Sequence, residues 1–184
     1  MTKSFILTLA ISLFYFLPIT AQNNEPEFIG EVYYINESGN INQLNREIAS
    51  TYTGFSWAST YNHVFKLKIN GGKAKTRLPK GRTINLIVRV AENKSDPLTF
   101  IKIYRLDTKK KERTTVLYEY RAGGILSGTR VRTENQVPFS VKKYGSSSYQ
   151  LTLDALKKGE YAILATDSYT NIEERAIVSC FGID

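Results

Sequence analysis

Few residues in this chain are suited to nucleophilic or metal chemistry. There is one histidine, His63, and one cysteine, Cys180. A Ser-His-Asp mechanism needs an imidazole of near-neutral pKa, but His63 opens an apolar run outside any recognisable motif, so we expect a structural or surface role for it. A zinc site needs three or four ligands, more than one histidine and one cysteine supply. We therefore predict no catalytic, cofactor-binding or metal-binding residues.

Hydrolysis by a pair of carboxylates is harder to exclude. The two acids of a glycosidase can come from distant parts of a chain, and nothing in this sequence singles out such a pair. Phosphate-binding loops are not indicated, because Gly71-Gly72 and Gly123-Gly124 are isolated and precede no helical pattern. A polysaccharide-directed hydrolase therefore remains an alternative without named residues.

An aromatic segment is the first candidate binding surface. Residues 51–61 combine aromatic side chains with small hydroxyl residues and contain the only tryptophan. Such a mixture supplies rigid contact area and adaptable hydrogen bonds, as binding loops do. The alternative is that Phe55 and Trp57 cap one end of the core. The candidate ligand-binding residues are Tyr52, Phe55, Trp57 and Tyr61.

A basic segment is the second candidate. Its members follow one another around a predicted hairpin, and residues 109–113 crowd a second turn. The alternative is that these side chains are solvated and discourage aggregation at sheet edges. The candidate anion-binding residues are Lys73, Lys75, Arg77, Lys80 and Arg82.

Short β-strands must position these residues. Apolar and aromatic residues alternate with polar ones; for example, Phe65, Leu67 and Ile69 share one face, while Lys66 and Lys68 share the other. Glycine, asparagine and aspartate separate the runs, as expected for antiparallel strands and turns. After Asn70-Gly71-Gly72, residues 74–78 are predicted to return as a hairpin. The other runs are 28–35, 41–48 (a short strand or a helical turn), 84–90, 98–106, 114–122, 128–133, 137–144, 149–153, 160–166 and 175–181.

Eight to ten strands at this spacing predict an all-β, antiparallel sandwich of two sheets. One local feature points to an immunoglobulin-like or fibronectin-like sandwich. In these folds a tyrosine just inside a strand hydrogen-bonds back to the preceding connection. Here Leu156 would plug the end of the core, Gly159 would supply the turn, and Tyr161 would make the hydrogen bond.

The N-terminus has the pattern of a cleavable signal peptide. Lys3 precedes an apolar stretch that ends near Leu17, and Ala21 provides a small residue at the cleavage point. About 13 apolar residues rise only about 20 Å as a helix, too short for the hydrocarbon core of a bilayer. We predict a signal peptide at residues 1–21 and a single domain at 22–184, with no integral membrane span after cleavage. Loss of Lys3 lowers the formal charge from +8 to +7, which favours anionic partners.

Cysteine content fits a domain that relies on its core. Exported small domains usually carry several disulfides, whereas Cys180 lies alone in an apolar run and is expected to be a buried, inert thiol. The motif of residues 156–161, the leader ending in Ala21-Gln22 and the segment 180–184 together resemble small uncharacterised exported β-sandwich proteins of Bacteroidetes bacteria. That resemblance implies a periplasmic or surface setting and brings no activity or active-site residues.

The sequence thus favours an exported, non-enzymatic β-sandwich protein that binds a partner or ligand in the periplasm, at the cell surface or outside the cell. An envelope or extracellular protein and an anionic polysaccharide are the expected partner classes, because an exported protein rarely meets nucleic acid. The alternatives are the hydrolase and a subunit of a surface assembly. An unpaired edge strand able to accept a donor strand would indicate the latter.

Overall fold

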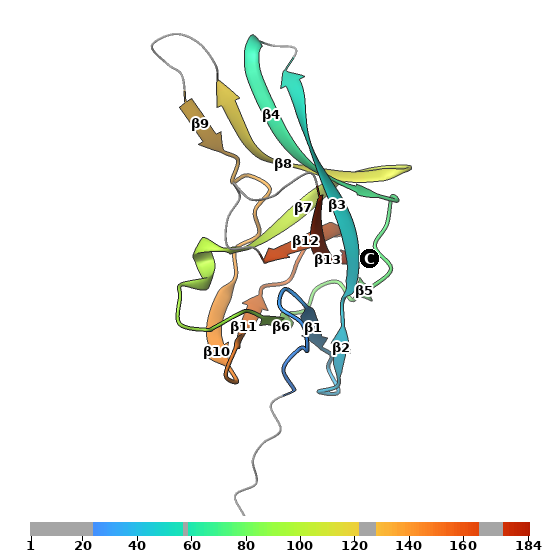
Figure 1. Ribbon diagram of the computed structural model, residues 1–184. Helices are drawn as coiled ribbons and strands as arrows, with labels where there is room; N and C mark the ends of the chain where they lie inside the picture. Colours follow the sequence, from blue (N-terminus) through green and yellow to red (C-terminus); the bar gives the residue numbers. More distant parts are fainter. Residues whose placement is uncertain (1–23, 57–58, 122–127, 166–174) are drawn as a thin grey trace, which may run out of the picture.

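A computed structural model of the chain describes residues 24–56, 59–121, 128–165 and 175–184 (Figure 1). The predicted signal peptide, residues 1–21, lies outside these ranges. Within them, no helix has the length and apolar character needed to cross a membrane.

The described residues form β-strands, which confirms the prediction of an all-β protein. Thirteen strands are present in these ranges, more than the eight to ten predicted. The run 41–48 divides into β2 and the start of β3, and β3 continues to Ser56, through part of the segment considered as a binding loop. The helical element among them is a 3-10 turn, η2 (Pro97–Thr99). The strands are β1 (Val32–Ile35), β2 (Ile41–Gln43), β3 (Asn45–Ser56), β4 (Ser59–Asn70), β5 (Arg77–Leu78), β6 (Ile84–Arg89), β7 (Ile101–Lys109), β8 (Glu112–Arg121), β9 (Gly128–Val131), β10 (Ser140–Tyr144), β11 (Ser148–Leu153), β12 (Gly159–Ala165) and β13 (Arg175–Ile183).

The strands form two sheets, and one of them closes on itself. The first has the order β10-β11-β6-β1-β2, with antiparallel neighbours and β6 at its centre. The second has the order β12-β7-β8-β4-β3-β13, and β13 pairs back with β12. These six strands therefore form a closed barrel, to which β5 and β9 add as short flanking strands. The sequence predicts two sheets, but this closure is not part of that prediction.

Two apolar cores share strands of the barrel. The first core lies between the sheets and joins Leu86 and Leu151 of the five-stranded sheet to Ile163 and Phe181 of the barrel. The second core fills the barrel interior, where the side chain of Leu67 is fully buried. The walls of the barrel thus separate two apolar compartments.

Strand β12 shows how the sequence allows this sharing. Successive side chains of a strand point to opposite faces. Tyr161 and Ile163 belong to the core between the sheets, whereas Ala162 and Leu164 belong to the barrel core. A continuous apolar run, rather than strict alternation, therefore fits a strand that is buried on both faces.

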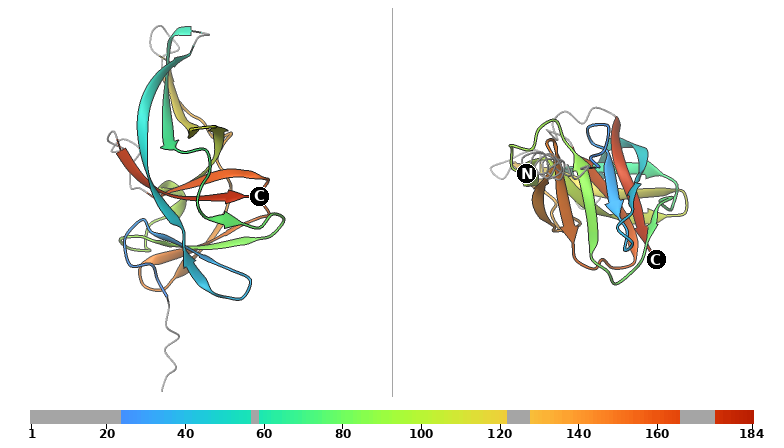
Figure 2. Two further views of the ribbon diagram at one scale, coloured as in Figure 1. Left: turned by 90° about the vertical axis from the view of Figure 1, so that its right-hand side faces the viewer. Right: turned by 90° about the horizontal axis from the view of Figure 1, so that it is seen from below.

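Four strands continue past the barrel as an extended sheet (Figures 1 and 2). Strand β13 pairs with β3 only as far as Ser50, whereas β3 continues to Ser56. Beyond that point β3, β4, β8 and β9 pair antiparallel with one another. We call this extension, residues 52–56, 59–66, 118–121 and 128–131, the arm.

The predicted hairpin after Asn70-Gly71-Gly72 is wrong. Residues 74–78 do not return along β4, because β4 already pairs with β3 on one side and with β8 on the other. The chain instead crosses the end of the barrel, and β5 pairs parallel with β13. Gly71 does adopt a positive φ of +85°, so the predicted turn is present, and only the path of the chain after the turn differs from the prediction.

The predicted tyrosine hydrogen bond is confirmed. The Tyr161 hydroxyl donates to the carbonyl oxygen of Lys157 over 2.7 Å, back to the connection that precedes β12. Leu156 packs against the core between the sheets, as predicted. Tyr161 is almost fully buried, and its ring stacks on Phe181 with the ring centres 5.3 Å apart. The bond and the stacking together fix the entry of β12 into both cores.

Candidate functional site

The arm presents aromatic side chains on one of its faces. Phe65 of β4 and Tyr118 of β8 are register partners, and their rings stack with centres 4.3 Å apart. The next pair towards the tip is His63 with Tyr120, whose ring centres are 6.4 Å apart. Val131 of β9 lies opposite Tyr118. Because register partners share a face of a sheet, these five residues form one surface, which we call the arm face.

The arm face continues the inner surface of the barrel. Leu67 and Ile69 of β4 point into the barrel core, and alternation places Phe65 on the same side of the strand. The exposed fraction rises along this surface from 0% at Leu67 to 40% at Tyr120 and 55% at Val131. An apolar surface therefore leaves the core and ends in solvent.

Ion pairs lie on the other face of the same strands, because Glu119 alternates with Tyr118 and Tyr120 and has Arg130 as its register partner. The Arg132 guanidinium is 3.4 Å from the carboxylate of Glu119 and 3.3 Å from that of Glu134. Arg130 also lies 3.2 Å from Glu134. The sheet itself therefore separates these partly exposed charges from the apolar arm face.

Three of the four candidate ligand-binding residues, Tyr52, Phe55 and Tyr61, lie in strands of the arm rather than in a loop. Tyr52 is 40% exposed, lies on the opposite face from Phe65, and has the Lys68 ammonium 5.9 Å from its ring centre. The backbone of Phe55 pairs with that of His63 in the arm. Tyr61 lies in β4, whereas Trp57 lies outside the described residues.

The backbone of Phe55 is distant from the barrel core. Ala49, a core residue, lies six positions earlier on β3, which corresponds to about 20 Å along an extended strand. Sequence reasoning missed the partners across the arm, Tyr118 and Tyr120. Tyr118 and Tyr120 are two positions apart in a predicted strand, as His63 and Phe65 are, so each pair lies on one face of its strand. The sequence does not show that these two strands pair, or in which register.

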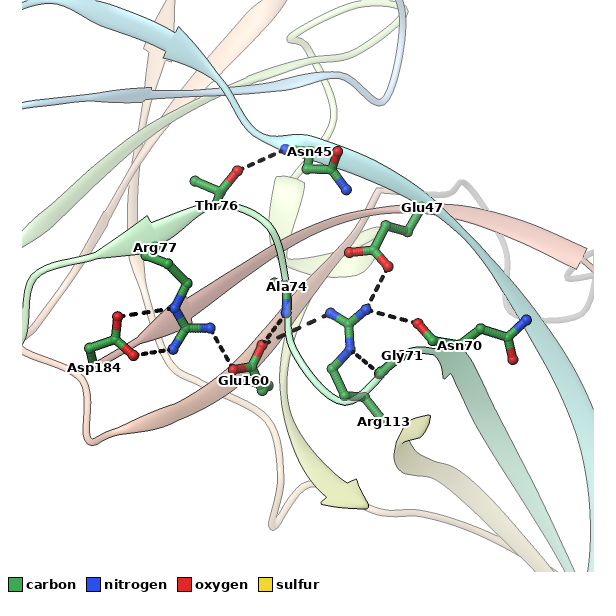
Figure 3. A network of polar contacts seen from close by, with 10 residues as sticks. All are labelled: Asn45, Glu47, Asn70, Gly71, Ala74, Thr76, Arg77, Arg113, Glu160 and Asp184. Atoms are coloured by element: carbon green, nitrogen blue, oxygen red, sulfur yellow. Dashed lines mark hydrogen bonds and ion pairs between the residues drawn. The ribbon is translucent and has the colours of Figure 1, made fainter. Parts of the chain in front are cut away.

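A cluster of buried charges occupies the other end of the barrel (Figure 3). At its centre is Arg113 of β8, whose side chain is 0% exposed. Its Nη2 donates to the Glu47 carboxylate over 2.5 Å and to the carbonyl oxygen of Asn70 over 3.2 Å, and its Nε donates to that of Gly71 over 2.9 Å. Its Nη1 lies 4.0 Å from the Glu160 carboxylate. A desolvated guanidinium is thereby held by two carboxylates and by backbone oxygens.

Glu160 extends the cluster towards the surface. One oxygen of its carboxylate accepts a hydrogen bond from Arg77 over 2.6 Å, and the other accepts the Ala74 N–H over 2.6 Å. Arg77 also donates to both carboxylate oxygens of Asp184. These hydrogen bonds, with Asp184 first, raise the pKa of Arg77, and they lower the pKa of Asp184. The cluster is an alternating series of charges in which each arginine lies between two carboxylates, which suits a structural role.

Cys180 confirms the expectation of a buried thiol. It is 0% exposed inside the barrel. Burial, reinforced by the charge of Glu47, raises the pKa of its thiol to about 12. Because the thiolate is the reactive form, Cys180 is not an activated nucleophile in this environment.

The candidate anion-binding residues separate into different surroundings. Arg77 is engaged by Glu160 and Asp184, and Arg82 forms an ion pair with Glu37. The remaining three are exposed. They are Lys73, Lys75 and Lys80.

A pocket of about 310 Å³ lies between the β1–β2 hairpin and the β5–β6 connection. Its lining includes the apolar side chains of Tyr34, Leu78 and Ile84, with Arg82 and Glu37 contributing charge. The pocket therefore contains one carboxylate, which is already paired with an arginine.

In the described part of the chain, no three histidine, cysteine, aspartate or glutamate side chains lie together in a way that could hold a metal ion. A scan against protein-family models and a search of curated proteins found no match to this chain.

Proposed function

We propose that this chain is an exported, non-enzymatic binding protein of the cell envelope or extracellular space, and that the arm face recognises a protein partner. The observation that carries the proposal is the exposure of Tyr120 and Val131 at the end of a surface that begins in the barrel core. Large apolar side chains that are contiguous and exposed are typical of interaction sites.

The composition of the arm face favours a protein partner over other ligands. Stacked aromatic rings, such as Phe65 on Tyr118, give a rigid apolar centre. Tyrosine, tryptophan and arginine are the residues that most often dominate binding energy at protein interfaces.

The geometry gives less support to a hydrolase. A glycosidase needs two carboxylates about 5 to 9.5 Å apart beside a substrate cleft. Among the residues lining the pocket, Glu37 is the sole carboxylate, and Arg82 neutralises it. Glu47 and Glu160 are engaged by arginines inside the barrel rather than facing a cleft.

A surface assembly built by strand addition is also less well supported. The edge strand β10 of the five-stranded sheet carries Lys142 and Lys143, both exposed. Charged side chains, lysine above all, discourage pairing at a sheet edge. The opposite edge, β2, is three residues long and offers few hydrogen-bonding groups.

The predicted leader and the positive charge support an exported setting, in the periplasm or beyond it. The layering of the five-stranded sheet on the β7-β12-β13 side of the barrel, with the Tyr161 hydrogen bond at its corner, supports an immunoglobulin-like relation for that half of the molecule. The immunoglobulin-like folds use many different surfaces for binding, so this relation suggests no particular ligand.

Partner capture with matched variants tests the proposal. Residues 22–184 would be immobilised and exposed to envelope and culture extracts, with Tyr120→Ser plus Val131→Ser as the arm variant. The control is Ile29→Ser plus Leu98→Ser, which removes apolar side chains of similar exposure elsewhere on the surface. We expect a protein retained by the parent and the control to be lost with the arm variant. Equal retention by all three proteins would rule out the arm face.

A further inference from the structure

Two lysine-rich segments far apart in the sequence lie against each other at the charge-cluster end of the barrel. The Gly71 N–H donates to the carbonyl oxygen of Lys111 over 2.8 Å, so the β4–β5 connection rests on the β7–β8 turn. A Cβ atom at Gly72 would lie 2.8 Å from the carbonyl oxygen of Lys109 and 2.9 Å from that of Lys110. Glycine is therefore required for this approach, because backbone oxygens cannot give way.

A third lysine-bearing segment, the connection before β12, lies nearby. The Arg105 guanidinium, on β7, donates to the carbonyl oxygen of Lys158 over 3.4 Å. The carboxylate of Asp184 lies close enough to both Lys158 and Lys73 for their charges to contribute, after the hydrogen bonds from Arg77, to its lowered pKa. The three segments therefore surround one end of the barrel.

Six lysines on these segments keep their charge free. All are exposed, and none forms an ion pair within the described ranges, whereas the neighbouring Lys109 is paired with Glu112. Two nearby carboxylates are also occupied, since Asp184 binds Arg77 and Glu112 binds Lys109. We call these six residues the basic rim: Lys73, Lys75, Lys110, Lys111, Lys157 and Lys158.

The buried cluster holds the basic rim in shape. Glu160 accepts the Ala74 N–H, between Lys73 and Lys75, and the Arg113 guanidinium binds the carbonyl oxygen of Gly71. The N–H of Asn45 donates to the Thr76 hydroxyl over 3.2 Å and fixes the end of the same connection. The charges of the rim are therefore carried on a backbone that is tied to the barrel at several points.

We propose that the basic rim binds a linear anionic polysaccharide that carries carboxylate or sulfate groups. Lysine ammonium groups act as point charges on flexible stems, which suits repeated anions on a polymer better than one bidentate ligand. The pocket described above, beside Tyr34 and Arg82, has no rim lysine in its lining, and the rim lysines are exposed, which suits an extended polymer better than a small enclosed anion. The site is separate from the arm face and does not depend on the function proposed for it.

Two other polyanionic surfaces fit the rim less well. A bilayer surface is usually bound by basic residues together with apolar side chains that insert among the lipids. The large apolar residues exposed in the described ranges lie outside the three rim segments. Single-stranded nucleic acid is usually bound with aromatic side chains that stack on the bases, and the exposed tyrosines, Tyr52 and Tyr120, belong to the arm.

Binding measurements with charge-matched variants test this proposal. The rim variant is Lys73→Ala, Lys75→Ala, Lys110→Ala and Lys111→Ala, and the control is Lys80→Ala, Lys94→Ala, Lys142→Ala and Lys143→Ala. All eight lysines are exposed, and both variants lose the same formal charge. The probes are polygalacturonate and dextran sulfate, with neutral dextran for comparison. Titration calorimetry at low and at high salt would give the affinities.

We expect the rim variant to bind the acidic polysaccharides about 10-fold or more weakly at low salt, and the control less than about 3-fold more weakly. High salt should weaken binding of the parent. Equal losses in the two variants would assign binding to overall charge and overturn the proposal. Tighter rim-dependent binding to phosphatidylglycerol vesicles or to single-stranded DNA would overturn the polysaccharide assignment.

Circular dichroism would show that both variants remain folded. If the rim variant fails to fold, the pair Lys110→Ala and Lys111→Ala replaces it, because both side chains lie exposed on a turn. Its matched control is Lys142→Ala with Lys143→Ala, two adjacent exposed lysines on β10. No difference between these pairs would likewise count against the rim.

Discussion

The two ends of strand β8 each carry a side chain in an energetically unfavourable environment, a buried charge at one end and an exposed aromatic ring at the other. Arg113, near its start, is 0% exposed, and carboxylates and backbone oxygens of the same chain surround its guanidinium. Tyr120, near its end, is 40% exposed and lies on an apolar surface that the described residues leave open. A buried charge that is paired by groups of the same chain, such as Arg113, supports the fold. An apolar side chain left exposed to solvent, such as Tyr120, instead indicates a surface suited to contact with a partner.

Removal of the central arginine should have the largest effect. Arg113→Met would leave the carboxylates of Glu47 and Glu160 buried without their shared cation, and should lower the free energy of unfolding by about 3–5 kcal/mol. Urea denaturation would measure the loss. Arg130→Met, which removes an exposed ion pair with Glu134, is the control and should cost less than about 1 kcal/mol. Similar losses in both variants would show that the cluster is not structural.

A second compensated charge should behave like the cluster. Glu25 is 12% exposed and accepts hydrogen bonds from the N–H groups of Ser146 and Ser147 and from the Ser148 hydroxyl. Burial alone would raise the pKa of Glu25, but these bonds outweigh it and lower the pKa to about 2. Glu25→Gln should therefore lower the free energy of unfolding at neutral pH by about 1–3 kcal/mol.

The pH dependence of that loss provides its check. Because the folded-state pKa of Glu25 lies below the ordinary value of 4.5, its contribution is complete above that pH and disappears as the pH falls towards about 2. The difference in unfolding free energy between the parent and Glu25→Gln should narrow across this window. A difference that stays constant down to the lower limit would refute the role of the carboxylate charge.

Two tyrosines test the same contrast with a smaller change. Tyr161→Phe removes a buried hydroxyl that donates to Lys157 and should lower the free energy of unfolding by about 1 kcal/mol. Tyr120→Phe removes a hydroxyl from the exposed arm face and should change it by less than about 0.5 kcal/mol. Thermal unfolding of the two variants side by side would separate them. Equal effects would break the contrast.

The smallest change in stability is expected in the arm. Tyr52→Ser and Val131→Ser each remove an exposed side chain and should change the free energy of unfolding by less than about 0.5 kcal/mol. Chemical denaturation measures the effect. A loss above about 1.5 kcal/mol in either variant would mean that the side chain supports the fold, and its exposure would then no longer indicate a binding surface.

Local sequence patterns predicted most of the strands and the hydrogen bond of Tyr161 at the start of β12. The alternation of Phe65, Leu67 and Ile69 defines β4, and the spacing from Leu156 to Tyr161 gives the tyrosine hydrogen bond. The closure of the barrel was not anticipated, although its signal is present. The unbroken apolar run from Tyr161 to Leu164 indicates a strand buried on both faces, which an ordinary two-layer sandwich does not require.

The buried cluster could not be located from the sequence. Arg113 ends a run of charged residues in a turn, where solvent exposure is the natural expectation. Its burial follows from the pairing of β8 with β4, which places it opposite Ile69 on the inner face. Its partners Glu47 and Glu160 come from distant strands, so only the long-range register shows that the charges meet.

The strands shared between the two cores also constrain the order in which the chain can fold. Strand β13, the last described strand to be synthesised, supplies Phe181 to the core between the sheets and Val178 to the core of the barrel. Until β13 is present, β3 and β12 have no partner to close the ring, and neither core is complete. Contacts so distant in sequence favour slow folding, and the ring can close only after β13 has been synthesised. A chain that has been synthesised only as far as β12 therefore leaves apolar side chains of both cores, such as Ile163 and Leu164, without their partners from β13.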